Sequence, residues 1–300
     1  MGTSPQLGSL DRKRVLVVGA SSGIGRAIAI RAVRSGARVA LASRRADLLN
    51  SAVDEATGAA PARPTSASAD RSSADRSSAD RSSADASSSA DASSAGALSG
   101  DRARSFVCDM ADEHAAREMV DLADAWLGGL DVVVYAAGTA PLGPVAELTG
   151  DAWTRLLATN VIGAAVVVAQ ALPELRRAEN GTVALLSSHT VGSPWPLLTA
   201  YSASKAALEE YARGLRLEEP GIRVLTVKVG NTATQFADGW DPVIFDRALG
   251  AWMEDGFMRH RVLTSDDAAE QILSSIVDRA GPSEVLVRGE DESQGQLPSH

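Results

Sequence analysis

Short apolar runs alternate with longer amphipathic stretches from residue 14 onward. Each short run is rich in Val and Leu and is bounded by Gly, Asp or Ser, which is typical of parallel strands covered on both faces. We expect strands at 14–19, 38–43, 104–109, 131–136, 182–188, 223–229 and 284–289. The intervening stretches repeat with a helical period, and we expect helices near 24–35, 45–56, 112–127, 151–178, 200–218 and 265–279.

This alternation predicts one fold class. Repeated strand–helix–strand units lay their strands side by side in parallel, with helices crossing over the sheet. The sequence therefore predicts an α/β, Rossmann-type doubly wound fold, with a seven-stranded parallel sheet and helices on both faces. The chain has 300 residues, 45% of them hydrophobic, so we expect a single domain over 1–300 with a sizeable core.

One segment interrupts the alternation. Residues 64–100 repeat ADRSS at a five-residue period and contain almost no large apolar side chain. Such a segment cannot bury enough surface to offset the entropy of ordering, so we expect a disordered low-complexity insertion between the second helix and the third strand. A docking tag or a phosphorylation tract is the alternative. We also expect the tail after about 290 to be loose.

Charge and cysteine content exclude several classes of protein. The net charge is −9 without a basic cluster, which argues against nucleic-acid binding. One cysteine, Cys108, cannot form an internal disulfide, and it reads as a buried strand residue. Four histidines with one cysteine show no metal-ligand spacing, so no metal is expected. Neither a signal peptide nor a membrane span is indicated, and we expect a cytoplasmic protein.

A glycine-rich turn follows the first expected strand and opens a helix. Its sequence, GASSGIG, places Gly19, Gly23 and Gly25 in a G-x-x-x-G-x-G spacing, which differs from the common dinucleotide fingerprint. Positions without a side chain let backbone N–H groups approach a pyrophosphate at the positive end of the helix. The residues between them, Ser21, Ser22 and Ile24, belong to the same expected cofactor site. A tight turn with no ligand is the alternative.

Two arginines indicate which nucleotide is bound. Arg44 and Arg45 follow the second strand, where an acidic residue bonds the ribose of NAD and a basic residue accommodates the 2′-phosphate of NADP. The sequence therefore predicts NADP(H) rather than NAD(H), with Arg44 ahead of Arg45. The alternative is that both arginines only begin a solvated helix. Asp109 either accepts a hydrogen bond from adenine or caps the following helix. Further cofactor contacts are expected from Met110, Ala136, Ala137 and Gly138.

A tyrosine–lysine pair is the candidate proton-transfer group. Tyr201 and Lys205 are four residues apart in an expected helix, which puts them on one face. A nearby ammonium lowers the pKa of a phenol, whose ordinary value near 10 makes it a poor base. Ser188 ends the fifth strand, where its hydroxyl could hold a substrate oxygen, and Asn160 lies mid-helix at some cost in helix propensity. A tolerated polar residue is the alternative for Asn160. His189 is discounted as a partner of Ser188, because adjacent strand residues face opposite ways.

These residues together resemble the short-chain dehydrogenase/reductase family, in its conventional short-subunit branch. The resemblance spans roughly residues 12–235, with GASSGIG as the cofactor turn and YAAG as the N-A-A-G motif. Tyr135 stands where the family usually has Asn, and Val229 replaces a Pro after the sixth strand. Further cofactor residues implied by the resemblance are Gly230, Thr232 and Thr234.

The resemblance implies a function and a catalytic tetrad. Tyr201 is the general acid in carbonyl reduction, Lys205 lowers its pKa and bonds the nicotinamide ribose, Ser188 polarises the substrate oxygen, and Asn160 holds a proton-relaying water. The implied reaction is hydride transfer between NADP(H) and a secondary alcohol or ketone carbon. One alternative is a non-catalytic NADP(H)-binding redox sensor, and another is a lyase or epimerase that uses the nucleotide transiently.

The segment 235–262 is where members of this family place a substrate lid. Large apolar residues gather there and before the candidate catalytic tyrosine, namely Trp195, Leu197, Leu198, Trp240, Phe245, Trp252, Met253, Phe257 and Met258. We therefore expect an apolar small-molecule alcohol or ketone as substrate, although packing of the lid or of a subunit contact would use the same residues. The resemblance also implies a homodimer or homotetramer through the helices that hold Asn160 and Tyr201.

Overall fold

The protein is described by a computed structural model, which covers residues 10–58, 102–257 and 262–289. Seven strands form one sheet in the order β3-β2-β1-β4-β5-β6-β9. Their bounds are Arg14–Val18 for β1, Arg38–Ser43 for β2, Ala103–Val107 for β3, Val132–Tyr135 for β4, Thr182–Ser188 for β5, Arg223–Val229 for β6 and Glu284–Val287 for β9. Every neighbouring pair is parallel. The predicted fold class is confirmed, and each strand lies within two residues of its expected bounds.

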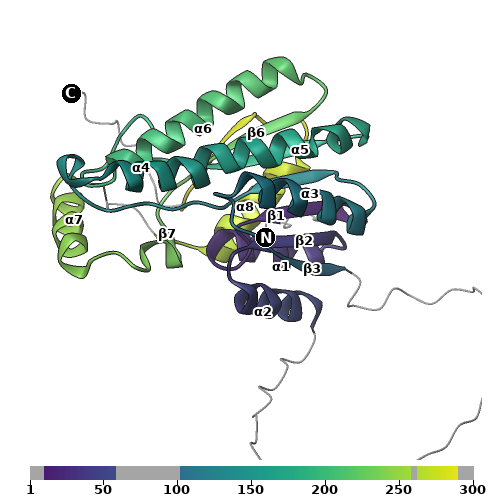
Figure 1. The fold of residues 1–300 in the computed structure, drawn as a ribbon, viewed down its shortest axis with the longest axis horizontal. Helices are drawn as coiled ribbons and strands as arrows, with labels where there is room; N and C mark the ends of the chain where they lie inside the picture. The colour runs from purple at the N-terminus through teal and green to yellow at the C-terminus, as the bar shows by residue number, and fades with distance from the viewer. Residues whose placement is uncertain (1–9, 59–101, 258–261, 290–300) are drawn as a thin grey trace, which may run out of the picture.

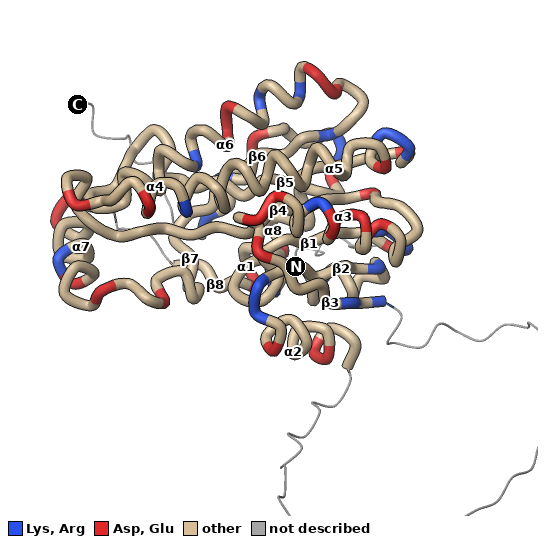
Figure 2. Tube along the Cα trace, in the orientation of Figure 1, with Lys and Arg blue, Asp and Glu red and all other residues tan. Residues whose placement is uncertain are grey.

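Helices cover both faces of this sheet (Figure 1). Those expected from the sequence are present as α1 (Gly23–Arg34), α2 (Ala46–Thr57), α3 (Glu113–Leu127), α4 (Gly150–Leu157) and α5 (Gly163–Arg177), α6 (Thr199–Glu218) and α8 (Ser265–Val277). Acidic and basic side chains are interspersed along α3, α6 and α7 (Pro242–Glu254) (Figure 2).

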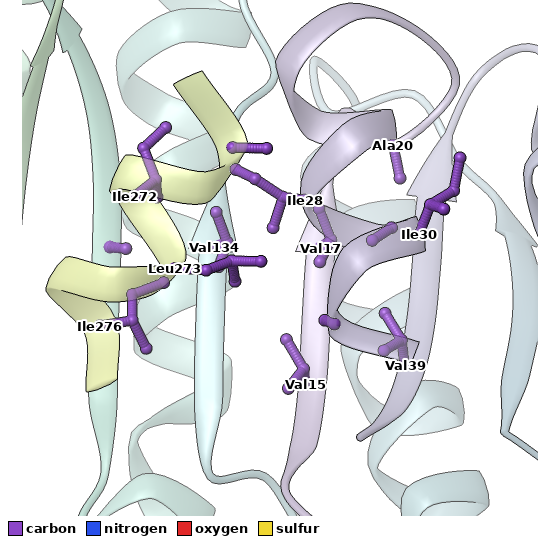
Figure 3. Packing of buried hydrophobic residues seen from close by; sticks show 14 of the residues in the cluster. Val15, Val17, Ala20, Ile28, Ile30, Val39, Val134, Ile272, Leu273 and Ile276 are labelled. Atoms are coloured by element: carbon purple, nitrogen blue, oxygen red, sulfur yellow. The ribbon is translucent and has the colours of Figure 1, made fainter. Parts of the chain in front are cut away.

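Alternate residues of the central strand β1 point into two different cores. Val15 and Val17 belong to the core formed with α1 and α8, which also contains Ile28 and Ile272 (Figure 3). Leu16 and Val18, which point to the opposite face of the sheet, pack beneath α3, α5 and α6. This two-sided burial is the physical reason that the strands read as continuous apolar runs rather than as alternating ones.

The helix expected over 151–178 is interrupted. It consists of α4 (Gly150–Leu157), a π-helical turn η4 (Ala158–Ile162) and α5 (Gly163–Arg177). A π-helical turn adds one residue to the hydrogen-bonded ring, and such turns often occur at functional sites. By length and composition alone the segment Gly150–Arg177 could cross a membrane, but its residues Val167, Val168 and Leu175 are buried against the sheet. We interpret it as a core helix.

A second, smaller unit follows β6. β7 (Thr232–Ala233) pairs with β8 (Leu263–Thr264), and between them lie the short 3-10 helix η5 (Gln235–Ala237) and the helix α7. In Figure 1, α7 lies beyond the carboxyl ends of the strands, at the left of the view. The predicted insertion at 64–100 and the tail after 290 fall outside the described residues.

Candidate active site

A cleft of about 840 Å³ runs across the carboxyl ends of the strands. One end is lined by the glycine turn and the end of β2, and the other by Ser188, Tyr201, Lys205 and the lid segment. Of the predicted site residues, only Asn160 does not line it; the residues that do are Gly19, Ser21, Ser22, Gly23, Ile24, Gly25, Arg44, Arg45, Asp109, Met110, Ala136, Ala137, Gly138, Ser188, Tyr201, Lys205, Gly230, Thr232 and Thr234. Open α/β sheets bind ligands at this edge.

The glycine turn is built so tightly that two of its positions exclude a side chain. Gly19 has φ +88°, and a Cβ there would lie 2.5 Å from the backbone N of Ala137. A Cβ on Gly25 would lie 2.4 Å from the Gly19 carbonyl oxygen. α1 begins at Gly23, its N-cap residue Ser22 makes no side-chain cap, and no acidic residue occupies its first turn. The backbone N–H groups and the positive helix end are therefore available to an anionic group.

Arg45 connects the end of β2 to the glycine turn. Its guanidinium donates to Ser21 Oγ at 3.1 Å and also bonds Ser22 Oγ, while Ser43 Oγ donates to Ser21 Oγ at 2.8 Å. Arg44 lies beside it, 67% exposed, with Nη1 3.9 Å from Asp109. Two guanidinium groups and two serine hydroxyls thus surround one corner of the cleft, which is a donor set that suits a phosphate.

Asp109 does not cap α3. The N-cap is Asp112, whose carboxylate accepts from the backbone N of Ala115 at 3.0 Å. Asp109 instead accepts from the backbone N of Ala111 at 3.0 Å and lines the cleft. The capping alternative is therefore wrong, and the predicted contact with adenine remains a prediction. Cys108 is buried as expected, and burial raises its pKa to about 11.

α6 brings the tyrosine–lysine pair to the end of β5. Tyr201 and Lys205 are both buried on one face of this helix, with Lys205 Nζ 5.8 Å from the centre of the Tyr201 ring. Lys205 Nζ also donates to the carbonyl oxygen of Leu186 in β5 at 2.8 Å. The neighbouring Ser187 donates to Glu209 of α6 at 2.6 Å. These two hydrogen bonds hold α6 against β5, and thereby hold Tyr201 close to Ser188.

The pKa of Tyr201 differs from the sequence expectation. Burial raises it to about 12, and a hydrogen bond with Ser188 only partly opposes this. Burial likewise lowers the pKa of Lys205 to about 8. The expectation that Lys205 holds the Tyr201 pKa below its ordinary value is therefore wrong for the protein without cofactor, because desolvation penalises both charged forms. At neutral pH, Tyr201 keeps its proton and Lys205 is mostly protonated.

Asn160 lies in η4 and is fully buried. Its Oδ1 accepts from the backbone N of Thr139 at 2.8 Å, and its Nδ2 donates to the Thr139 carbonyl at 2.9 Å and to Ser204 Oγ at 3.0 Å. Ser204 Oγ in turn donates to the backbone oxygen of Tyr201 at 2.7 Å. Asn160 is therefore an anchored residue that ties the segment after β4 to α6. Sequence reasoning missed Thr139, which follows the YAAG motif, and Ser204, which is one of the three unassigned positions between Tyr201 and Lys205.

The segment 235–257, where a lid was predicted, contributes to an aromatic wall at the end of the cleft where Tyr201 lies. Trp240 Nε1 donates to the Ala140 carbonyl at 2.7 Å, and Trp252 Nε1 donates to the Pro196 carbonyl at 2.8 Å. Both indoles line the cleft, as Trp195 and Leu198 do. The other predicted wall residues do not line it: Leu197, Phe245 and Phe257 pack behind the wall, Met253 is exposed, and Met258 lies outside the described residues.

Two further residues at this end differ from what the sequence indicated. Phe236 of η5 lines the cleft, and its ring lies 5.1 Å from that of Tyr201 in an edge-to-face arrangement. Sequence reasoning missed it, although it lies inside the predicted lid. His189 follows the last residue of β5, so strand alternation does not apply to it; its ring lies 5.0 Å from Trp195 and lines the cleft. Within the described residues no group of three His, Cys, Asp or Glu side chains could hold a metal.

The family of the chain is shown by comparison with known proteins. A family model described as short chain dehydrogenase matches residues 13–87 and 65–242. The chain therefore belongs to the short-chain dehydrogenase family, a family of oxidoreductases that bind nicotinamide cofactors.

Two curated relatives and one solved structure illustrate the range of similarity. A short chain dehydrogenase of Pseudocercospora fijiensis is 29% identical over 73% of this chain and 59% of its own length. Glycine betaine reductase ATRR of Emericella nidulans is 27% identical over 95% of this chain and 19% of its own length. The chain thus spans less than two thirds of both proteins. A short chain dehydrogenase from Burkholderia cenocepacia, solved in complex with NADP, has a TM-score of 0.68 at 26% identity and covers 94% of this chain and 98% of its own.

Proposed function

We propose that this chain is an NADP(H)-dependent oxidoreductase acting on a secondary alcohol or ketone of apolar character. The observation that carries the proposal is a single cleft with two chemically different ends. At one end stand Arg44, Arg45 and the exposed N-terminus of α1; at the other stand Tyr201, Lys205 and Ser188. A dinucleotide is long enough to reach from the first end to the second, as it does across this type of sheet.

The preference for NADP(H) rests on the corner around Arg45. A 2′-phosphate there would meet Arg44 and Arg45, together with the Ser21 and Ser22 hydroxyls that Arg45 already bonds. A charge-assisted hydrogen bond from a guanidinium is roughly twice as strong as a neutral one. The relative solved with NADP is consistent with this preference. Bound there, the cofactor supplies or accepts the hydride.

The chain itself supplies proton transfer and orientation. Tyr201, whose pKa is held near 12 by burial, carries its proton at neutral pH and gives it to the carbonyl oxygen during reduction. Lys205 places a positive charge beside the phenolate that remains and so limits the cost of forming it. Ser188, whose Oγ already accepts from Thr190 at 3.1 Å, directs its own hydroxyl proton toward the substrate oxygen. Asn160 keeps the segment around Gly138 in place and is the proposed holder of a proton-relaying water.

An apolar substrate follows from the aromatic wall. The indole N–H groups of Trp240 and Trp252 are both used by backbone carbonyls, so these side chains offer ring surface rather than hydrogen bonds to a ligand. Phe236, 38% exposed, presents its ring next to the catalytic phenol. Ring surface of this kind favours an alkyl or aryl group beside the reacting carbon.

A matched panel of ketones tests this function. We expect NADPH oxidation with acetophenone and with cyclohexyl methyl ketone, and at least about tenfold lower kcat/KM for 4-carboxyacetophenone, since the indole N–H groups of Trp240 and Trp252 are already used by backbone carbonyls. Equal turnover of the charged and uncharged ketones would contradict the apolar pocket. Tight NADPH binding without turnover across a broad carbonyl panel would favour a redox sensor, and reaction without net change of cofactor would indicate a lyase or epimerase. A homodimer or homotetramer remains a prediction from the resemblance, and a cytoplasmic location remains a prediction from the sequence pattern.

A further inference from the structure

Tyr135 is the residue at which this chain departs from the family's N-A-A-G motif. It ends β4, its side chain is fully buried, and its hydroxyl donates to the carbonyl oxygen of Thr159 at 2.5 Å. Burial raises the pKa of this phenol well above its ordinary range, so it remains a hydrogen-bond donor at every physiological pH. The bond joins the central sheet to the residue directly before Asn160.

The acceptor belongs to the π-helical turn. η4 replaces the regular helix over Ala158–Ile162, and its backbone therefore requires support from outside the helix to hold one conformation. Gly163 closes the turn, and a Cβ at this position would lie 2.7 Å from the Tyr135 hydroxyl and 2.4 Å from the Met110 carbonyl. The turn, the glycine and the phenol thus fit one another, and a side chain at 163 would displace the phenol.

Asn160 directly follows Thr159, and its side chain is held by the segment after β4 and by α6. Its carboxamide bonds both backbone groups of Thr139 and the hydroxyl of Ser204. A Cβ on Gly138 would lie 3.4 Å from Lys205 Nζ and 3.6 Å from Asn160 Oδ1, so both polar groups stand beside the same glycine of the cleft. A shift of η4 would therefore move Asn160 relative to Lys205.

We propose that Tyr135 is a positioning residue, which fixes η4 on the sheet and thereby sets the place of Asn160 beside Lys205. The proposal rests on the proposed role of Asn160 in proton supply. This role explains why a tyrosine can stand in this motif. The phenol of Tyr135 reaches from β4 to the carbonyl oxygen of Thr159, whereas the shorter side chain of an asparagine at the same position would not reach it. Tyr135 touches no reacting atom and acts only through Thr159 and Asn160.

Tyr135→Phe isolates the hydroxyl, because it keeps the ring in the core. Tyr211→Phe is the matched control: Tyr211 lies on α6, is half-buried and lines no part of the cleft, and burial raises its pKa to about 12. We expect Tyr135→Phe to lower kcat about tenfold, short of the hundredfold that a misplacement of about 1 Å can cost. The KM for NADPH should stay within about twofold, and the solvent isotope effect on kcat should rise because proton supply becomes slower. Tyr211→Phe should change none of the three.

Amide hydrogen exchange makes the test independent of the substrate. The backbone N–H of Thr139 is the donor to Asn160 Oδ1, so Tyr135→Phe should speed its exchange about tenfold, while Tyr211→Phe should not. Unchanged exchange at Thr139 together with unchanged kcat would overturn the proposal. Faster exchange in a protein that reduces no carbonyl would support the positioning role and contradict the proposed function instead. Should Tyr135→Phe not fold, Tyr135→Asn introduces the family's residue, and wild-type exchange at Thr139 in that variant would equally overturn the proposal.

Discussion

Replacement of Arg44 and of Arg45 by alanine should have different effects on the two nicotinamide cofactors. Arg44 lies beside Asp109, outside the glycine turn, whereas Arg45 donates hydrogen bonds to Ser21 and Ser22 within that turn. Only NADPH carries the 2′-phosphate that either guanidinium would contact. Arg44→Ala should therefore weaken NADPH alone, and Arg45→Ala should weaken both cofactors, NADPH more than NADH.

The exposure of Arg44 sets the size of its effect. A hydrogen bond to a charged group contributes about 1.5–3 kcal/mol, and the 67% exposure of Arg44 argues for the lower end because water competes for the phosphate. The dissociation constant of NADPH should then rise about tenfold. Arg45→Ala also removes the hydrogen bonds to the Ser21 and Ser22 hydroxyls that hold the glycine turn, each contributing about 0.5–1.5 kcal/mol. The dissociation constant should therefore rise about threefold for NADH and about thirtyfold for NADPH.

Isothermal titration of both cofactors at two salt concentrations provides the assay. Arg34→Ala is the control for loss of one positive charge, since Arg34 is 58% exposed and pairs with Glu55 on the outside of the domain. The difference between variants should shrink at about 1 M salt, where exposed charges are screened within about 3 Å. An equal loss of NADPH and NADH affinity in Arg44→Ala would refute the assignment of the phosphate corner.

Two further predictions concern titration. Lys205, with its pKa lowered to about 8 by burial, should lose its charge as the pH rises through 8, so kcat/KM should fall on the alkaline side with an apparent pKa near 8; Lys205→Arg should lack this fall, and a flat wild-type profile to pH 10 would contradict it. Burial alone would raise the pKa of Asp131, but three hydrogen bonds from Arg14 outweigh it, and the net shift is downward. Asp131 therefore contributes its full stability above its unfolded pKa near 3.9, and loses that stability as the pH falls from there through its lower folded pKa. Urea unfolding should show Asp131→Asn destabilised by about 2 kcal/mol at pH 7 and by less at pH 3, whereas the exposed Asp246→Asn should match wild type at both.

The sheet was predictable because its strands are buried on both faces. Runs such as RVLVV in β1 send Val15 to one core and Leu16 to the other, and only an apolar run satisfies both. The glycine turn could also be predicted from the sequence, since Gly19 approaches Ala137 so closely that only glycine fits there. In such places local sequence and tertiary structure impose the same requirement.

The π-helical turn and the pKa of Tyr201 could not be read from the sequence. The helix period across 151–178 is continuous, and the hydrogen bonds that η4 makes with Tyr135 and Thr139 join residues more than 20 positions apart in the sequence. Spacing correctly placed Lys205 near Tyr201, but it did not indicate the burial that raises the pKa of Tyr201. Which aromatic residues of the segment 235–257 face the cleft depends on the direction of η5 and α7, which the sequence does not specify; Phe236 of η5 was missed for that reason.

In the proposed function, one cleft binds the cofactor at one end, and Tyr201 donates a proton to the substrate at the other. Tyr201→Phe tests it most directly, because the ring and its packing on Phe236 are kept while the hydroxyl is removed. NADPH binding measured by titration should remain within about twofold of wild type, and reduction of acetophenone should fall by about 10²–10⁴, the contribution of a general acid. Ketone reduction at the wild-type rate in this variant would contradict the account.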